Sequence, residues 1–456
     1  MAMGKYFGTD GYRGEANVSL TADAAFRIGK FLAWHYQQGL GEGETCKIVI
    51  GKDTRRSSYM FEYAIAAGIT AAGADAYLMH VTTTPSVAYI VKTEGFRCGV
   101  MISASHNPFA DNGIKVINEK GEKLSDEVAA KIEDYLDGRS GEVPLATGSR
   151  IGRTIDFVAG RNRYIGFLIS LSTRSFKGHK VALDCANGSA SSIAKAVFDA
   201  LGAETCVINN EPDGTNINRH AGSTDIAGLQ RFVVEKGCEI GFAFDGDADR
   251  CLAVDSQGRL IDGDAILFIE GKYLKKKGLL RGNKVVTTVM SNLGLYKALD
   301  KEGIEYDQTD VGDRFVYEDM VGNGYALGGE NSGHIIFLRH ETTGDGIVTA
   351  IKLLETIVEE KKSVEELLGD FRLYPQILLN IRVKDRQAAQ DDEAVAAAAK
   401  QAEEALGANG RILLRASGTE PLIRVMVEAP ELEVCRKWAE SVIDVIKARG
   451  LEEMRK

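Results

Sequence analysis

Apolar and polar positions follow the same order in three stretches of the chain. In each stretch a short apolar run leads through a loop of small polar residues into a helical segment, and a second apolar run follows. The first runs begin at Ile48, Val181 and Val285, and the helical segments cover about 59–73, 191–201 and 293–301. Copies that begin more than 100 residues apart are too widely spaced for a solenoid. We therefore expect three homologous α/β domains, each with its own mainly parallel mixed sheet.

The C-terminal part of the chain has a different pattern. Strands are expected at 377–383, 411–415 and 422–428, and helices at 392–406 and 431–449. The last helix has one apolar face, formed by Leu432, Cys435, Trp438, Val442, Val445 and Ile446. This order predicts a small α+β domain. Breaks rich in Gly, Pro and polar residues lie at 138–153, 255–258 and 373–375. The predicted domains are therefore 1–153, 154–255, 256–370 and 371–456.

Composition and net charge limit the kinds of molecule that the protein could bind. The chain has 456 residues and a net charge of −10, which argues against nucleic acid or an anionic membrane surface. An anionic small molecule would have to be bound by a few local Arg and Lys residues. The seven Cys are scattered without a C-x-x-C pair, and no apolar run is long enough to cross a bilayer. We expect a cytoplasmic protein with reduced thiols, either a monomer or a homodimer.

A candidate nucleophile follows the apolar run 98–102. The run ends at Ser103, Ser105 and His106, so that a buried strand delivers two hydroxyls and an imidazole onto a loop. A hydroxyl beside an imidazole at the carboxyl end of a strand is a place to expect a nucleophile. A serine hydrolase is disfavoured, because G-x-S-x-G is absent and adjacent loop residues rarely point the same way.

A candidate metal site follows the apolar strand 240–244. Asp245, Asp247 and Asp249 can converge only around a cation, because unpaired carboxylates repel one another. Oxygen ligands at a strand end suit Mg²⁺. An EF-hand is excluded, since its sixth position would be Arg250 and its twelfth Ser256. An acidic, solvated turn is the alternative, and the preceding apolar strand argues against it.

Two further loops could bind a ligand. The first loop lies between two predicted strands and carries hydrogen-bond donors for a phosphate group. They come from Arg415, Ser417, Gly418, Thr419 and Arg424. A polar β-turn would need the same Gly and Ser but not the arginines. In the glycine-rich loop 328–334, groups for a polyol come from Glu330, Asn331, Ser332 and His334. His334 could equally be a core or capping residue. The loop Gly8–Gly14 carries Arg13 but lacks G-x-G-x-x-G, so no dinucleotide is predicted.

A serine loop, a carboxylate cluster and a phosphate site together fit phosphoryl transfer better than hydrolysis. Ser105 would carry the phosphoryl group, the metal would neutralise its oxygens, and the arginines would hold the remote end of the substrate.

Four motifs, in this order, resemble the α-D-phosphohexomutase superfamily. They are Ser103–Pro108, Asp245–Arg250, Gly329–His334 and Arg415–Pro421, one in each predicted domain. Within the superfamily the chain is most similar to the bacterial branch that acts on glucosamine phosphates, on the grounds of Phe7–Gly14, Pro212–Asn218, Ala221–Thr224 and Asn331. Tyr12 and Ala221 depart from that branch, which commonly has Val and Cys there, and neither carries chemistry.

The resemblance implies four domains around a central cleft and a role for each loop. Ser105 is expected to be the phosphoserine and a metal ligand, with Ser103 in support. The expected Mg²⁺ ligands are Asp245, Asp247 and Asp249. The residues expected to bind the sugar are Glu330, Asn331, Ser332 and His334. The residues expected to bind the non-transferring phosphate are Arg415, Ser417, Gly418, Thr419 and Arg424. The residues expected to assist proton and phosphoryl transfer are Arg13, His106, Lys115 and Arg250.

The implied reaction is the reversible conversion of glucosamine 6-phosphate to glucosamine 1-phosphate through a phosphoserine and a hexosamine 1,6-bisphosphate. It would supply amino-sugar nucleotide and cell-wall precursor synthesis. The alternatives are a phosphomannomutase or phosphoglucomutase of the same superfamily, an Mg²⁺-dependent sugar phosphatase, and a non-catalytic sugar-phosphate sensor.

Overall fold

The computed structural model describes residues 4–8, 10–41, 43–417 and 421–453. The chain forms two compact units, one of residues 1–290 and 304–369 and the other of residues 291–303 and 370–456. All seven cysteines are free thiols. Among the described residues, no helix combines the length and the apolar character that crossing a membrane requires.

The first sheet, in the larger unit, has the strand order β1-β2-β6-β5-β3-β4-β7. Its strands are β1 (Phe7–Gly8), β2 (Gly11–Glu15), β3 (Lys47–Lys52), β4 (Asp75–Val81), β5 (Cys98–Ile102), β6 (Asp111–Asn118) and β7 (Thr154–Asp156). Its helices are α1 (Ala22–Gln37), α2 (Arg56–Ala71), α3 (Thr84–Glu94) and α4 (Asp126–Leu136). Helices α1, α2 and α4 cover one face of the sheet and form a core with Ile48 and Ile50 of β3. Helix α3 covers the other face and packs against Val49.

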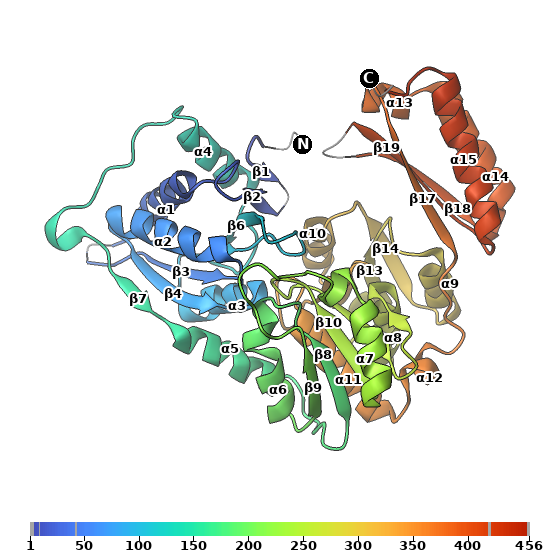
Figure 1. Cartoon of the computed structure of the whole chain (residues 1–456), viewed down its shortest axis with the longest axis horizontal. Helices are drawn as coiled ribbons and strands as arrows, with labels where there is room; N and C mark the ends of the chain where they lie inside the picture. Colours follow the sequence, from blue (N-terminus) through green and yellow to red (C-terminus); the bar gives the residue numbers. More distant parts are fainter. Residues whose placement is uncertain (1–3, 9, 42, 418–420, 454–456) are drawn as a thin grey trace. The chain divides into compact units, whose positions relative to one another are not determined.

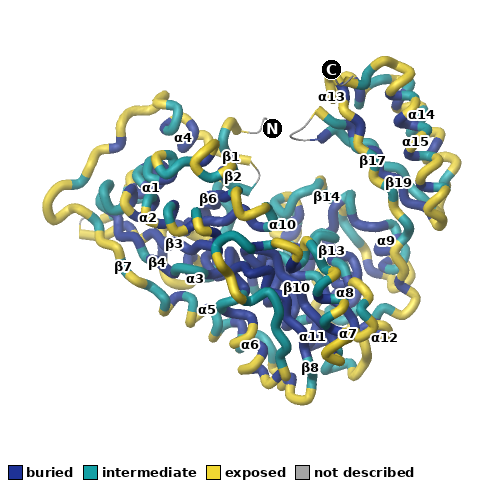
Figure 2. Tube along the Cα trace, viewed as in Figure 1, coloured by how far each residue is buried: buried dark blue, intermediate teal, exposed yellow. Residues whose placement is uncertain are grey.

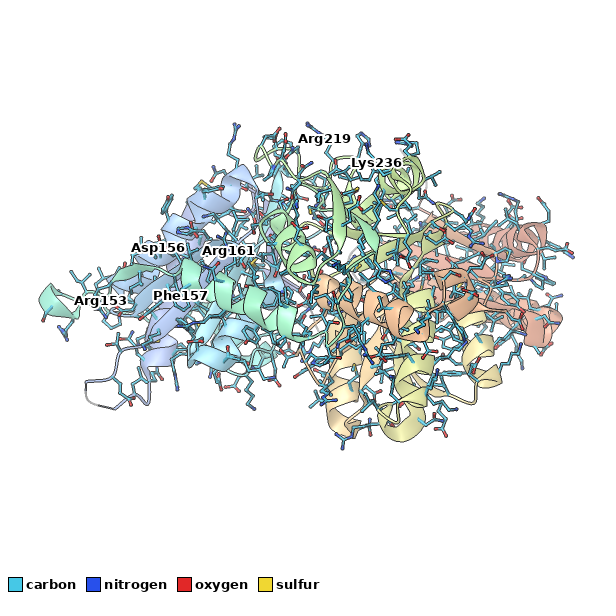
Figure 3. All side chains as sticks on the ribbon, turned by 90° about the horizontal axis from the view of Figure 1, so that it is seen from below. Arg153, Asp156, Phe157, Arg161, Arg219 and Lys236 are labelled. Carbon is cyan, nitrogen blue, oxygen red and sulfur yellow. The ribbon has the colours of Figure 1, made fainter. Side chains whose placement is uncertain are left out.

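The segment that leaves the first sheet is anchored to it before the next helix begins. Figure 3 shows Arg153, Asp156 and Phe157 along this segment, which enters α5 (Val158–Ser170). Arg153 Nη2 lies 2.7 Å from Asp75 Oδ2, and the Phe157 ring packs edge-on against Tyr77. Strand β7 pairs in parallel with β4, so the first sheet extends to residue 156.

The second and third sheets also lie in the larger unit. The second has the order β12-β11-β10-β8-β9, with β8 (Lys180–Asp184), β9 (Glu204–Ile208), β10 (Ile240–Phe244), β11 (Cys251–Asp255) and β12 (Leu260–Ile261). The third has the order β14-β13-β15-β16, with β13 (Lys284–Thr288), β14 (Glu305–Thr309), β15 (Leu327–Gly329) and β16 (Ile335–Phe337). Their helices are α6 (Ala194–Ala200), α7 (Ala227–Lys236), α8 (Gly263–Lys276), α10 (Asp313–Asn323), α11 (Gly346–Glu360) and α12 (Val364–Leu368). In Figure 2 the strands β8 and β10 are buried, and exposed residues lie on the outer helices and loops.

The three sheets repeat one topology, which confirms the prediction of three homologous α/β domains. In each, a first strand pairs in parallel with the second and third, and a fourth runs antiparallel to the third. The connections between third and fourth strands are 103–110, 245–250 and 330–334. Three of the four predicted motifs therefore occupy the same topological position.

One predicted helix is shorter than expected. The segment expected to be helical at 191–201 is a 3₁₀ turn at Ser189–Ser192 followed by α6 from Ala194. At the end of this 3₁₀ turn the Ser192 hydroxyl donates to the carbonyl of Ser189 (3.1 Å), a local side-chain bond of the kind that competes with regular helical hydrogen bonds.

The smaller unit contains the C-terminal sheet, which is antiparallel with the order β17-β19-β18. Its strands are β17 (Gln376–Arg382), β18 (Arg411–Ala416) and β19 (Leu422–Glu428). Its helices are α9 (Leu293–Lys301), α13 (Arg386–Gln390), α14 (Glu393–Leu406) and α15 (Leu432–Ala448). The predicted α+β pattern is confirmed, with the addition of the unpredicted α13. Cys435, Val442 and Ile446 pack in the core as expected, whereas Leu432, the first residue of its helix, is exposed.

Candidate active site

Ser105 lies in the connection between β5 and β6 with a left-handed backbone (φ 50°). Its hydroxyl donates a hydrogen bond to Asp245 Oδ2 (2.5 Å), although the two residues are 140 positions apart. Its backbone N–H donates to Ser103 Oγ (2.9 Å), and Ser103 in turn donates to Asp53 Oδ2 (2.7 Å). The two serines therefore differ in function: Ser105 faces the carboxylates, and Ser103 supports the loop.

His106 Nδ1 lies 3.4 Å from Ser105 Oγ. The expectation that these adjacent residues point apart is wrong, because the left-handed turn at Ser105 brings both side chains together. Burial, and then the charges of Arg250 and Arg13, lower the pKa of His106 to about 4. The imidazole beside the hydroxyl is therefore uncharged at neutral pH.

The carboxylates of Asp245, Asp247 and Asp249 converge, with one oxygen of each within 4.8 Å of the others. All three residues are buried, and the Oδ1 atoms of Asp247 and Asp249 have no hydrogen-bond partner in the part of the chain that the structure describes. Burial and the charges of Asp249 and Asp247 raise the pKa of Asp245 well above its usual range. Unpartnered buried carboxylate oxygens in an all-oxygen set fit a divalent cation such as Mg²⁺.

Lys115, on β6, supplies positive charge to this cluster. Its Nζ lies 2.8 Å from Asp247 Oδ2, 3.0 Å from Asp10 Oδ2 and 3.6 Å from Asp249 Oδ2. Burial by itself would lower the pKa of Lys115, but the three carboxylates outweigh it and raise the pKa, so the ammonium stays charged. Arg13 forms an ion pair with Asp10.

Arg250 follows Asp249 directly in the sequence. Its backbone N–H donates to Asp245 Oδ1 (3.2 Å), and its Nε lies 4.0 Å from Asp249 Oδ1. Burial opposes ionisation of Arg250, but the surrounding carboxylates, Asp249 first, raise its pKa. The side chain is therefore a fixed cation beside the carboxylates.

The loop 330–334 is bound to the start of β11, just after the three aspartates, and to the start of α8. Gly333 O accepts from Cys251 N–H (3.0 Å), and Asn331 O accepts from Gly263 N–H (3.1 Å). His334 is only 3% exposed, and its Nε2 lies 3.4 Å from Asp313 Oδ2. Within the described ranges, His334 Nδ1 and the buried Ser332 Oγ have no hydrogen-bond partner. Glu330 Oε1 accepts from Gly312 N–H (3.2 Å).

A cavity of about 480 Å³ opens beside these groups and is lined by Asp10, Lys115, Lys123, Asp249, Asp313 and His334. Its size is in the range of small-molecule sites. Lys123 Nζ lies 2.9 Å from Asp10 Oδ1 and 2.6 Å from Asp313 Oδ2, so charges of opposite sign alternate along the wall. No sequence motif marks Asp10, Lys123 or Asp313 as residues of this cavity. Only Asp10 had a local signal, its place in the loop Gly8–Gly14.

In the smaller unit, Arg415 and Arg424 lie directly opposite each other on β18 and β19. Ile423 and Val425 point into the core, so Arg424 and its cross-strand partner Arg415 point to the other face of the sheet. Two guanidinium groups side by side on one face of a sheet can donate together to one anion. Among the described residues, Arg424 Nε is buried without a hydrogen-bond partner. Ser417 is buried and its carbonyl accepts from Arg386 (2.7 Å), whereas Gly418 and Thr419 lie outside the described residues.

The chain resembles known proteins over its whole length. Four domain families of phosphoglucomutase/phosphomannomutase match it: alpha/beta/alpha domain I at residues 4–141, domain II at 162–258, domain III at 262–374 and the C-terminal domain at 378–445. A phosphoglucosamine mutase of Lachnospira eligens is 62% identical over 448 residues, which cover 98% of this chain and 99% of that protein. The chain therefore belongs to the phosphoglucomutase/phosphomannomutase family, which is a family of mutases.

Solved structures share the fold. A phosphoglucomutase/phosphomannomutase family protein from Burkholderia thailandensis superposes with a TM-score of 0.82 at 24% identity, covering 99% of this chain and 98% of that one. An Aspergillus fumigatus N-acetylphosphoglucosamine mutase, in complex with GlcNAc-6P and magnesium, has a TM-score of 0.68 at 18% identity and covers 98% of this chain and 96% of its own.

Proposed function

We propose that this protein interconverts glucosamine 6-phosphate and glucosamine 1-phosphate, with Ser105 as the phosphoserine and Mg²⁺ bound by Asp245, Asp247 and Asp249. The observation that carries the proposal is the hydrogen bond from the Ser105 hydroxyl into the cluster of three buried carboxylates. The choice of glucosamine is supported by the 62% identity to a phosphoglucosamine mutase. The proposal includes a cytoplasmic location, in line with seven free thiols.

The chain's own groups account for the transfer step. Phospho-Ser105 gives its phosphoryl group to a sugar hydroxyl: the bond from phosphorus to Ser105 Oγ breaks, a bond to the sugar oxygen forms, and the hydroxyl proton passes over to Oγ. Neutral His106, 3.4 Å from Oγ, is placed to hold that proton in transit. Lys115 and Arg250 remain cations next to the transferring group. When bound, Mg²⁺ would supply further positive charge for the phosphoryl oxygens.

The product of the first transfer is a 1,6-bisphosphate, which must turn round and return its other phosphoryl group to Ser105. Both orientations require a place for the phosphate that is not being transferred. Arg415 and Arg424, opposite each other on the same sheet face, are the proposed place. The sugar hydroxyls would meet Glu330, Asn331, Ser332 and His334, and Arg13 would assist from its ion pair with Asp10.

The test measures turnover of the purified full chain on the 6-phosphates of glucosamine, glucose and mannose, with Mg²⁺ and a trace of the matching 1,6-bisphosphate. We expect kcat/KM to be highest for glucosamine 6-phosphate. A preference for glucose or mannose would contradict the substrate and leave the family intact.

The chemistry is tested separately from the substrate. Intact mass should show one added phosphoryl group after incubation with the bisphosphate, and peptide mapping should place it on Ser105. Release of inorganic phosphate in step with substrate loss would indicate a phosphatase and would overturn the mutase proposal.

A further inference from the structure

The nucleophile lies within a group of strained backbone conformations. Positive φ values at residues other than glycine recur in the loops around the carboxylates, among them Ser105 (50°), Ala186 (53°), Asn187 (49°), Asn218 (58°) and Ala248 (58°). Residues other than glycine rarely adopt this conformation, and it persists only where surrounding contacts enforce it. The contacts that enforce it at Ser105 are therefore part of what aims its hydroxyl.

Two side chains hold the carbonyl groups on either side of His106. Arg55 Nη2 donates to Ser105 O (3.1 Å) and to Asn107 O (2.6 Å). Asn218 Nδ2 donates to the same two oxygens, at 2.8 and 3.1 Å. Both carbonyls therefore have donors from two directions, and the Ser105 N–H is bound by Ser103. With its backbone N–H and carbonyl both hydrogen-bonded in this way, Ser105 directs its hydroxyl to Asp245.

Arg55 lies just after β3, the first strand of the first repeat. Arg55 is fully buried and forms an ion pair with Asp53. Asp53 also accepts from Ser103 Oγ (2.7 Å) and Ser58 Oγ (2.6 Å). The carboxylate of Asp53 therefore ties the guanidinium to the serine that binds the Ser105 N–H.

Asn218 is held by the loop that follows the first strand of the second repeat. Asn218 N–H donates to Ala186 O (2.9 Å), in the loop that follows β8. That loop is joined to the first repeat by the Thr54 hydroxyl, which donates to Asn187 O (2.6 Å). The Ser105 carbonyl also lies so close to Gly246 that a Cβ there would come within 2.4 Å of it. Movement of the carbonyl is therefore blocked on a third side.

We propose that Arg55 and Asn218 are positioning residues for the phosphoryl-transfer step. By holding the carbonyls of Ser105 and Asn107, they keep Ser105 left-handed, which directs its hydroxyl to Asp245. The inference rests on the proposed function and extends it to Asn218, in the segment Pro212–Asn218. Neither residue is among those to which the proposed function assigns the substrate or Mg²⁺.

The test is the variant Asn218→Ala, measured with glucosamine 6-phosphate and saturating Mg²⁺. Loss of the donor should lower kcat about 10- to 100-fold, because a buried carbonyl loses a partner and the nucleophile loses its alignment. KM should stay within about threefold, since no substrate contact is removed. Phosphorylation of Ser105 by the 1,6-bisphosphate, followed by intact mass, should slow by the same factor.

The matched control is Asn216→Ala. Asn216 lies in the same segment, and its Nδ2 donates to Glu211 O (3.0 Å), away from Ser105. We expect its kcat to stay within about threefold of the unaltered protein. An equal fall in kcat for both variants would overturn the proposal in favour of a structural role for the whole segment, as would an unchanged kcat for Asn218→Ala.

A second measurement does not depend on turnover. In a crystal structure of Asn218→Ala, Ser105 should leave the left-handed region and its Oγ should move away from Asp245. A Ser105 that keeps its φ near 50° and its contact with Asp245 would contradict the positioning role, whatever the substrate. Absence of turnover in the unaltered protein, by contrast, would contradict the proposed function alone. Arg55→Lys keeps the charge but loses the planar fork, and it should reproduce the loss of kcat.

Discussion

The Ser105 site and the Arg415–Arg424 pair are both proposed to hold a phosphate group, and they are built in opposite ways. Around Ser105 the side chains are buried and the backbone is left-handed, held by contacts from two repeats. The arginine pair lies on two regular antiparallel strands, with both residues partly exposed and no positive φ at either position.

The difference follows from what each place has to do. Forming a bond requires one oxygen atom to be held in a fixed direction. This requirement explains why the backbone at Ser105 is strained and the side chains around it are buried. Holding a phosphate that does not react needs charge and a fork of donors, and an open face tolerates either end of a substrate that turns round. The first region should therefore control kcat, and the second should control KM.

The largest effect is expected from Ser105→Ala. Without the hydroxyl no phosphoryl group can be carried, so turnover should fall by about 10⁴-fold or more. Ser103→Ala removes only a supporting hydrogen bond and should cost roughly tenfold. Steady-state kinetics of both variants would check this. Equal losses of turnover in the two variants would contradict the different roles assigned to Ser103 and Ser105.

Asp245→Asn should separate stability from activity. Burial and two neighbouring carboxylates raise the pKa of Asp245, so its ionised form is disfavoured in the metal-free fold. The amide should therefore raise the free energy of unfolding of the metal-free protein, while weakening Mg²⁺ binding and lowering kcat by about 10²–10³-fold. Denaturant titration and calorimetric Mg²⁺ titration measure the two effects. A destabilised variant with normal Mg²⁺ affinity would argue against a metal site.

Arg424→Met should act on binding. A lost charge-assisted interaction should raise KM for the sugar phosphate by about 10- to 100-fold, with a smaller effect on kcat. Arg382→Met is the control, since Arg382 lies on the same sheet and pairs with Glu453 at the surface. If kcat for Arg424→Met falls while KM is unchanged, the proposed division between the two regions is wrong.

The smallest effect on activity is expected from Glu270→Gln, because Glu270 lies within α8 and belongs to neither region. Burial raises the pKa of Glu270 to about 7, so the folded state binds a proton between about pH 4.5 and 7 that the unfolded state releases. Stability therefore falls as pH rises through this window, by about 3 kcal/mol in total.

Glutamine cannot ionise, and it should keep the contact with Thr356. The variant should be more stable than the unaltered protein at pH 8 and similar to it at pH 4.5, with unchanged kcat. Denaturant unfolding at both pH values checks this. A variant that is less stable at pH 8 would mean that the Glu270 carboxylate is stabilised by its neighbours.

Order along the chain is enough to predict the three repeats, the C-terminal α+β pattern and the strand-end loops. Apolar runs mark buried strands such as β5 and β10, and the polar residues that follow them must lie at strand ends. Three motifs also fall between the third and fourth strands of their repeats, a regularity that appears only once the strands are paired.

Contacts between residues far apart in the sequence determine which side chains enter the site and where they point. Periodicity cannot tell Ser103 from Ser105, and the difference arises from a left-handed turn and from an aspartate 140 positions away. Arg55 and Asn218 carry no local mark of a role, because their partners are backbone carbonyls in another loop. Local patterns record which residues are buried, whereas the direction of a side chain depends on the loops packed against it.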